Sequence, residues 1–308
     1  MPPKNTAIAS SQNERELLEH CDFAYFSNTT ILYNAEHSQE VLVINSPCCF
    51  AVIALQGAQL LEFRPHGQNN WLWLSPLSNF EPGKAIRGGI PICLPWFGVH
   101  QQNPQLPKHG IARTQQWQLT TINECPNKTE IVFELHYDGH LQQLAPEPFD
   151  CQLIFDISDE LNIGFNLKNC SDKSQHISWA MHNYFAVDNS AKTRIYGLQN
   201  HAFLDNTENL QSFQQSGPIV FTAEVDRVYQ NTIEPQRLIA HHTLDINGHH
   251  CPSCIVWNPG ALSAMGMDDI QGHYNEFVCV ERGCAFEDAL ILSAGETFRS
   301  TMQVKKIA

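Results

Sequence analysis

Alternation of apolar and polar residues with a period of two is the feature that most limits what this chain can fold into. In the stretch TEIVFELHYDG, one set of alternate positions is apolar and consists of Ile131, Phe133, Leu135 and Tyr137. Successive side chains of a β-strand point to opposite faces of its sheet. The stretch is therefore predicted to be a strand with one buried face.

Segments of the same type recur over most of the chain: 41–45, 49–55, 117–122, 151–158, 161–169, 177–187, 219–221, 254–257, 277–280 and 297–304. A short polar link separates 151–158 from 161–169, which predicts a hairpin. Long amphipathic helical stretches are scarce. Because each strand has an apolar face to cover, we expect an all-β fold, a large antiparallel two-sheet β-sandwich with few short helices.

One domain is the better prediction for this chain. Its 308 residues are an ordinary length for a large β-domain. No linker rich in Gly, Ser or Pro divides it, and no repeat of fixed period is visible. We expect a single β-sandwich domain over residues 21–308, preceded by an N-terminal extension, residues 1–20, with a short helix near 13–20.

The charge of the chain limits its partners. Its formal net charge of −14 repels nucleic acid and anionic membranes, so neither is expected as a partner. The N-terminus lacks the apolar core of a signal peptide, and no run of about 18 apolar residues is present. Eleven scattered cysteines fit reduced thiols better than disulfides. We expect a cytoplasmic monomer that binds a small molecule.

Two predicted strands carry groups that can move protons. In HISWAMHNYFAV, a strand would place His182 and Tyr184 on a face with small residues, as in the floor of a groove. In NEFVCVERG, Glu281 ends a strand that is apolar on both faces, and burial would raise its pKa and make it a better base. The alternatives are a histidine on a solvated face and a glutamate paired with Arg282 in solvent.

A cationic loop is the second candidate site. In AIRGGIPICLPWFGVH, Arg87 precedes two glycines and two prolines, so its guanidinium would be rigidly presented to a phosphate or carboxylate. The stretch KHGIART adds His109 and Arg113, which suggests one anion or polyol site. In VDRVY, Asp226 could bind sugar hydroxyls. The alternatives are an arginine that ties down its own loop and a set of unrelated surface charges. For Asp226 the alternative is a pair with Arg227 or a turn cap.

Motifs for other chemistries are weak or missing. The stretch HHCPSC has a single Cys-x-x-Cys, and its continuation reads as a strand, so we expect no metal. Neither GxGxxG nor GxxxxGK, the glycine-rich phosphate loops, occurs. The nucleophile elbow GxSxG is missing as well.

Several motifs in order resemble those of the aldose 1-epimerase superfamily, and most closely its hexose-6-phosphate mutarotase branch. The resemblance covers nearly the whole chain after the first twenty residues. It is carried by LQGAQLLEFRP, WLWLSP, IRGGIPICLPWFG, KHGIART, SWAMHNYFAV, VDRVY, VWNP and FVCVERG.

The resemblance implies an enzyme without a cofactor that interconverts the α and β anomers of a hexose 6-phosphate, a glucose-6-phosphate 1-epimerase. It implies His182 and Glu281 as catalytic residues, which we expect to act as acid and base. It implies four substrate-binding residues, Arg87, His109, Arg113 and Asp226, with the two arginines near the phosphate. The alternatives are an aldose 1-epimerase for unphosphorylated sugars, a non-catalytic carbohydrate-binding regulatory protein and a glycoside hydrolase.

Two residues depart from the pattern of the family. Leu94 stands where relatives often have an aromatic residue, which predicts a different pocket shape. Arg282 follows the glutamate where proline is frequent, which predicts a shifted pKa for Glu281.

Overall fold

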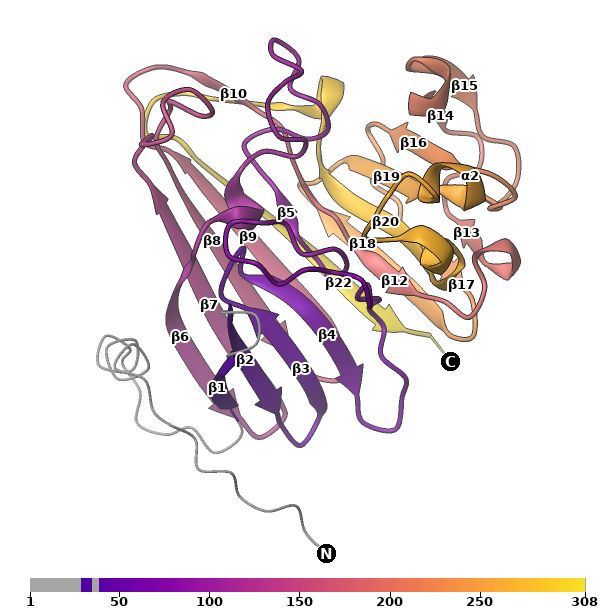
Figure 1. Ribbon diagram of the computed structural model, residues 1–308, viewed down its shortest axis with the longest axis horizontal. Helices are drawn as coiled ribbons and strands as arrows, with labels where there is room; N and C mark the ends of the chain where they lie inside the picture. Colours follow the sequence, from indigo (N-terminus) through magenta and orange to yellow (C-terminus); the bar gives the residue numbers. More distant parts are fainter. Residues whose placement is uncertain (1–28, 35–38, 308) are drawn as a thin grey trace, which may run out of the picture.

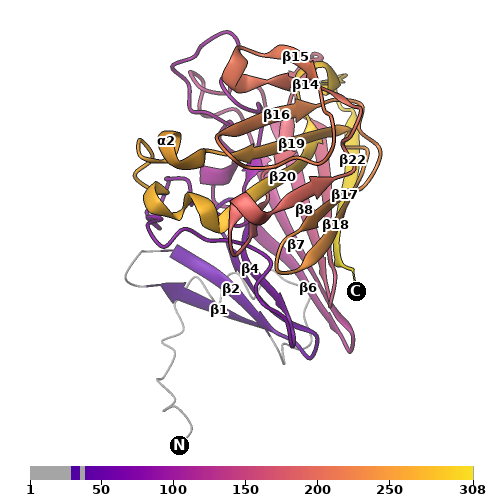
Figure 2. The ribbon, with the colours of Figure 1, turned by 90° about the vertical axis from the view of Figure 1, so that its right-hand side faces the viewer.

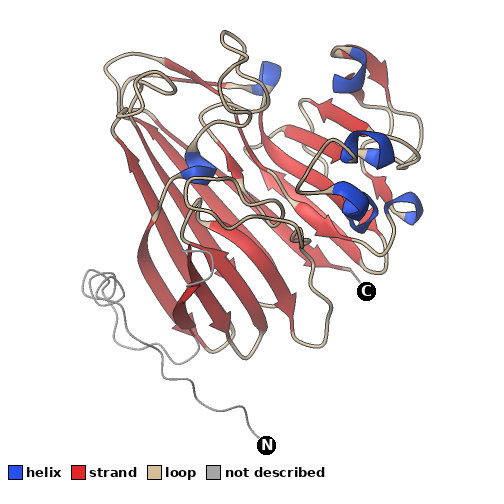
Figure 3. Cartoon of the chain, in the orientation of Figure 1, coloured by secondary structure: helices blue, strands red, loops and turns tan. Residues whose placement is uncertain are grey.

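Antiparallel sheets in two layers make up the structure, a computed structural model that describes residues 29–34 and 39–307 (Figures 1 and 2). Strands dominate and the helices are short (Figure 3), which confirms the all-β prediction. The helix expected near 13–20 lies outside the described residues, and the extent of the single domain stays a prediction. Within the described residues, no helix has the length and apolar character needed to cross a membrane.

The first layer is an eight-stranded sheet. In spatial order its strands are β13 Arg194–Tyr196, β17 Gln236–Ile239, β18 Thr243–His249, β22 Thr297–Lys306, β9 Leu161–Asn169, β8 Phe149–Ile157, β7 Lys128–Tyr137 and β6 Gln118–Cys125. Strands β7, β8 and β9 bury every second residue, as the alternation predicts. The predicted hairpin is β8 and β9, which pair from Ile157↔Leu161 onward.

A second eight-stranded sheet forms most of the other layer. Its strands are β15 Gln211–Gln214, β14 Ala202–Asp205, β16 Val225–Tyr229, β19 Ser253–Asn258, β20 Phe277–Cys284, β11 Trp179–Met181 and β5 Ile92–Cys93, with β12 Tyr184–Ala186 also paired to β20. A four-stranded sheet is joined to this layer by the bridge Leu60↔Ile90, and it consists of β1 Thr29–Asn34, β2 Gln39–Asn45, β3 Cys49–Ala54 and β4 Gln59–Pro65.

The remaining elements are short. Strands β10 Gln175–Ile177 and β21 Leu290–Leu292 pair with each other. The helical turns are α2 Gly260–Ala264, η1 Ala112–Thr114, η2 Ser190–Lys192, η3 Asn206–Glu208, η4 Gln271–Glu276 and η5 Phe286–Asp288. Helix α2 and turn η4 lie outside the second sheet, on the side away from the first (Figure 2).

The hydrophobic core lies between the layers. Trp179 of β11 stacks on Phe165 of β9 with ring centroids 3.9 Å apart, and both side chains are fully buried. Burial of a large apolar side chain is worth about 1.5–3 kcal/mol. Residues Val278 and Val280 of β20 also face this core, whereas Phe277 and Cys279 pack in a separate cluster on the outer face. The outer face of the second sheet is therefore free to form a site.

The sequence predicts one strand over residues 177–187, and in this respect the prediction is wrong. It is divided among β10, β11 and β12, although β11 and β12 both pair with β20 in one continuous register. At the break, the Asn183 backbone N–H donates to Met181 O, two residues back, and the Asn183 side-chain amide donates to Val280 O of β20. The alternation of faces persists across the break, so His182 stays on the outer face.

Candidate active site

A cavity of about 840 Å³ opens on the outer face of the second sheet. Loop residues 95–102 line one side of it, and β16, β19 and β20 contribute to its floor. All six residues that the sequence singled out line this one cavity: Arg87, His109, Arg113, His182, Asp226 and Glu281. The structure thus brings together residues that are spread over nearly two hundred positions.

His182 and Glu281 face each other across neighbouring strands. His182 Nδ1 lies 3.5 Å from Glu281 Oε1, and the two side chains are 6% and 1% exposed. Neither His182 Nδ1 nor Glu281 Oε2 has a hydrogen-bond partner within the described part of the chain. Buried polar atoms without partners are costly, so these atoms are suited to bind a ligand that enters the cavity.

The surroundings push the pKa values of the two groups apart. Burial, and to a lesser degree the carboxylate of Asp226, raises the pKa of Glu281 well above its ordinary value. Burial, followed by the charges of Arg87 and Arg113, lowers the pKa of His182 well below its ordinary value. Both shifts favour the uncharged forms of the two groups over an ion pair, so that the mobile proton of the pair is held by Glu281. Such a pair can accept one proton and donate another.

The loop that carries Arg87 needs its glycines. Gly88 and Gly89 have φ values of 116° and 61°. A Cβ at Gly89 would lie 2.1 Å from Leu60 O of β4, so only glycine lets the loop pass this close. Since the loop is held against β4 at this point, the position of the Arg87 backbone is fixed.

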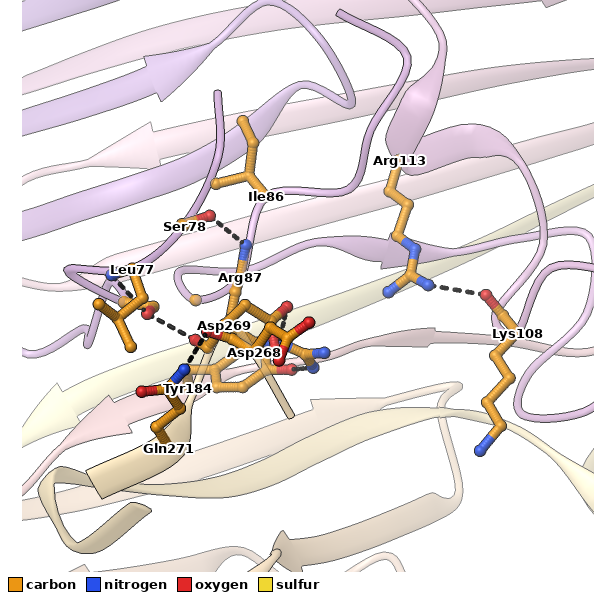
Figure 4. A network of polar contacts seen from close by, with 12 residues as sticks. Leu77, Ser78, Ile86, Arg87, Lys108, Arg113, Tyr184, Asp268, Asp269 and Gln271 are labelled. Carbon is orange, nitrogen blue, oxygen red and sulfur yellow. Dashed lines mark hydrogen bonds and ion pairs between the residues drawn. The ribbon is translucent and has the colours of Figure 1, made fainter. Parts of the chain in front are cut away.

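The Arg87 guanidinium is already engaged within the protein. Its Nε donates to Asp269 Oδ2 over 2.8 Å, and its Nη1 donates to Tyr184 Oη over 2.9 Å (Figure 4). Tyr184 in turn stacks on the imidazole of His182. Arg87 therefore lies on the side of the cavity where the proton-moving pair is.

His109 and Arg113 come from the loop before η1 and from η1 itself. His109 has a φ of 68°, and its Nδ1 accepts a hydrogen bond from the Gly98 N–H over 3.2 Å. Because Nδ1 is an acceptor, the proton of the neutral ring is on Nε2. Burial, followed by the charge of Arg113, lowers the pKa of His109, which keeps the ring neutral. Arg113 Nη2 donates to Lys108 O over 2.7 Å.

Asp226 lies on β16, beside Trp257 of β19. Its Oδ2 accepts a hydrogen bond from Asn206 Nδ2 over 2.7 Å, and burial raises its pKa. The alternative of a pair with Arg227 is wrong, because Arg227 donates to Gln215 Oε1 and lies near Asp205 instead.

Arg282 and Leu94, the two departures from the family pattern, are buried away from the cavity. Arg282 points to the opposite face of β20 from Glu281 and donates to Gln236 Oε1 and Thr232 O, each over 2.8 Å. It is 1% exposed, so the alternative of a solvent pair with Glu281 is wrong, and it is not among the causes of the Glu281 pKa shift. Leu94 is fully buried in the core and does not line the cavity.

Sequence reasoning missed four residues of the site. Lys108 and Trp257 line the cavity. They belong to the motifs KHGIART and VWNP, which carry the family resemblance. Asn206 lies in a polar stretch without a pattern. Asp269 is 182 positions from Arg87, its ion-pair partner, and no local signal could have linked the two.

Comparisons with known proteins find relatives along most of the chain. Residues 40–305 match the family model described as aldose 1-epimerase. A provisionally named glucose-6-phosphate 1-epimerase of Salmonella typhimurium is 33% identical over 250 residues, which cover 79% of this chain and 82% of the relative. One from Cenchrus ciliaris is 30% identical, with 87% of this chain and 85% of the relative covered. The crystal structure of a provisionally named mutarotase of Salmonella typhimurium matches with a TM-score of 0.84 and 28% identity, covering 95% of this chain and 98% of that one.

Proposed function

Since the chain belongs to the aldose 1-epimerase family and is a mutarotase, we propose that it interconverts the α and β anomers of a hexose 6-phosphate. The phosphate is the part of the proposal that the family alone does not provide. Support for it comes from the names of the relatives and from the distribution of charge in the cavity.

The observation that carries the proposal is a pair of cations without acidic partners. Among the residues that the structure describes, four cationic side chains line the cavity. Arg87 pairs with Asp269 and Lys173 pairs with Glu147, whereas Lys108 and Arg113 form no ion pair with any described residue. A phosphate monoester carries a charge of about −1.5 to −2 at pH 7. Lys108 and Arg113 can balance this charge in a protein whose net charge is −14.

The chemistry follows from the one-proton pair of His182 and Glu281. One member takes the proton of the O1 hydroxyl while the other gives a proton to the ring oxygen O5, and the C1–O5 bond breaks to leave an aldehyde. Rotation about C1–C2 then presents the other face of C1. Closure reverses both proton transfers, so each residue is the acid in one direction and the base in the other. A positioned acid or base contributes about 10²–10⁴-fold.

The other side chains of the site would orient the sugar. His109 Nε2–H is available as a donor, and the Asp226 carboxylate can accept from sugar hydroxyls. Trp257 offers an apolar face beside them. Binding of the phosphate far from C1 would hold the ring against the pair, since positioning lowers the barrier of the reacting step.

The test measures anomerisation rates by NMR with glucose 6-phosphate and glucose side by side. Arg113→Ala and Lys108→Ala should each lower kcat/KM for the phosphorylated sugar by about 10–100-fold, the worth of a charged hydrogen bond. Both should leave the rate with glucose within about twofold. Lys173→Ala is the matched control, because Lys173 lines the same cavity but is paired with Glu147.

Equal losses for both sugars, or a parent enzyme that prefers glucose, would contradict the phosphate proposal. An aryl glycoside belongs in the same assay, because Asp226 and Glu281 line one cavity and glycoside hydrolases use two carboxylates. Release of the aryl alcohol would overturn the proposal in favour of hydrolysis.

A further inference from the structure

No described residue other than His182 itself forms a hydrogen bond with the His182 imidazole. Its Nδ1 is buried without a hydrogen-bond partner, and the carboxylate of Glu281 is 3.5 Å away. A ring that no other residue anchors by a hydrogen bond takes its orientation mainly from packing. Packing therefore has to fix the angle at which His182 meets a substrate.

Tyr184 provides the main packing contact of this ring. The two rings are nearly parallel, with an interplanar angle of 6° and centroids 4.6 Å apart. His109 and Trp257 contact the imidazole at steep angles, 71° and 86°. Parallel contact restricts tilting of the ring more than an edge contact does, so the plane of His182 follows the plane of Tyr184.

Tyr184 is itself held at both ends. Its ring stacks on Trp73, with centroids 6.0 Å apart, and its Oη accepts a hydrogen bond from Arg87 Nη1 over 2.9 Å. Arg87 Nε donates to Asp269 Oδ2 over 2.8 Å (Figure 4). The Asp269 backbone O accepts a hydrogen bond from Ser75 Oγ. A continuous series of contacts thus runs from Asp269 through Arg87 and Tyr184 to His182.

Asp269 does not line the cavity, although Arg87 and His182 do. Asp269 lies in the segment between α2 and η4, and this segment covers the outer face of the second sheet. We propose that Asp269 is a positioning residue, which fixes the plane of the His182 imidazole through Arg87 and Tyr184 without touching the substrate. The inference rests on the proposed function only for the kinetic part of its test, in which the turnover of a sugar is measured.

Charge gives Asp269 a second effect on the same ring. The titratable groups that face His182 are Arg87, His109, Arg113, Tyr184 and Glu281. The charges of Arg87 and Arg113 already lower the pKa of His182, after burial. Asp269 offsets the charge of Arg87, so its removal should lower the pKa of His182 further and move the acid limb of the kcat profile to lower pH.

The test compares Asp269→Ala with Asp269→Asn, because Asn keeps an acceptor for Arg87 and removes only the charge. We expect Asp269→Ala to lower kcat by about 10–100-fold, the cost of a misplaced catalytic group, with KM changed by less than about twofold. Asp269→Asn should lose less activity and should show the shifted acid limb. Asp269→Glu, which restores the charge, should return the acid limb toward that of the parent.

Asp245→Ala is the matched control, because it removes another Arg–Asp pair, with Arg237, in the other sheet. Its kcat and pH profile should equal those of the parent. A kcat of Asp269→Ala within about twofold of the parent, or an effect on KM alone, would overturn the inference.

A second readout does not depend on turnover. NMR of the His182 ring resonances should show a changed chemical shift and a lower titration midpoint in Asp269→Ala. Unchanged ring resonances would overturn the inference even if the rate falls. If the parent interconverts no sugar, the proposed function is wrong, and these resonances still decide the inference.

Discussion

Replacement of Glu281 by Gln should abolish most of the activity and yet stabilise the protein increasingly as the pH rises. Glu281 is 1% exposed, and burial raises its pKa well above the ordinary value of 4.5. Glutamine has nearly the same shape but does not titrate. The exchange therefore isolates the effect of the buried carboxyl group on folding.

The magnitude follows from proton linkage. Between its ordinary and its raised pKa, the carboxyl holds a proton in the folded protein and has lost it in the unfolded chain. Unfolding then releases a proton, so the stability of the parent falls as the pH rises, by about 1.4 kcal/mol per pH unit. The amide introduced by Glu281→Gln is an unpaired buried group that costs about 1–3 kcal/mol at every pH. Near pH 4.5 the variant is thus no more stable than the parent, and it gains above that pH.

Urea unfolding at pH 5, 6, 7 and 8 measures this difference. We expect the free energy of unfolding of Glu281→Gln, relative to the parent, to increase by about 1.4 kcal/mol per pH unit until the folded-state pKa is passed. Glu208→Gln, on the exposed turn η3, corrects for the loss of one negative charge from an acidic chain. A constant difference between Glu281→Gln and the parent, or one that shrinks with pH, would refute the reasoning.

Two further predictions concern stability. Burial lowers the pKa of His242 to about 4, so the free energy of unfolding of the parent should fall by up to about 3 kcal/mol as the pH falls from 6.5 to 4. His242→Gln does not titrate and should lose correspondingly less in urea unfolding. Equal losses in parent and variant would contradict this prediction. Gly110→Ala should destabilise the protein by more than about 2 kcal/mol and lower the rate by displacing His109, because φ is 71° and the new Cβ would lie 2.0 Å from Leu94 O. Gly67→Ala is the control, because Gly67 has a similar φ of 74° but open space around it, and it should cost about 1 kcal/mol. Equal costs of the two variants in thermal unfolding would contradict the clash at Gly110.

The sequence predicted the fold because alternation is a local property. In β7, β8 and β9 the apolar residues alternate with polar ones, and the apolar set is the buried set. The residues of each segment therefore indicate the strand and its buried face without knowledge of its neighbours. The outer-face placement of His182 and Glu281 could be predicted for the same reason. The break at Asn183 could not, because the Asn183 side chain is bonded to Val280 O, 97 positions away in the chain.

The sequence predicts on which face of a sheet a charged residue lies, but it does not predict the ion-pair partner of that residue. Arg87 was expected to hold a phosphate, but two of its donors are used by Asp269 and Tyr184. A lone lysine in a loop, such as Lys108, does not by itself indicate an anion site. In the fold, Arg113 donates to Lys108 O, and neither side chain has an acidic partner among the described residues, so together they can bind an anion. A sequence shows which charges exist, whereas the fold determines which of them neutralise each other.

The central claim is that His182 and Glu281 act as one unit that shares a single proton. The most direct measurement compares the anomerisation rates of Glu281→Gln, His182→Gln and the double variant with that of the parent, by NMR under single-substrate conditions. Each single variant should lose about 10²–10⁴-fold, and the double variant should lose no more than about threefold beyond the worse single one, because either change already disables the pair. Losses that multiply in the double variant would mean that the two residues work independently and would contradict the account.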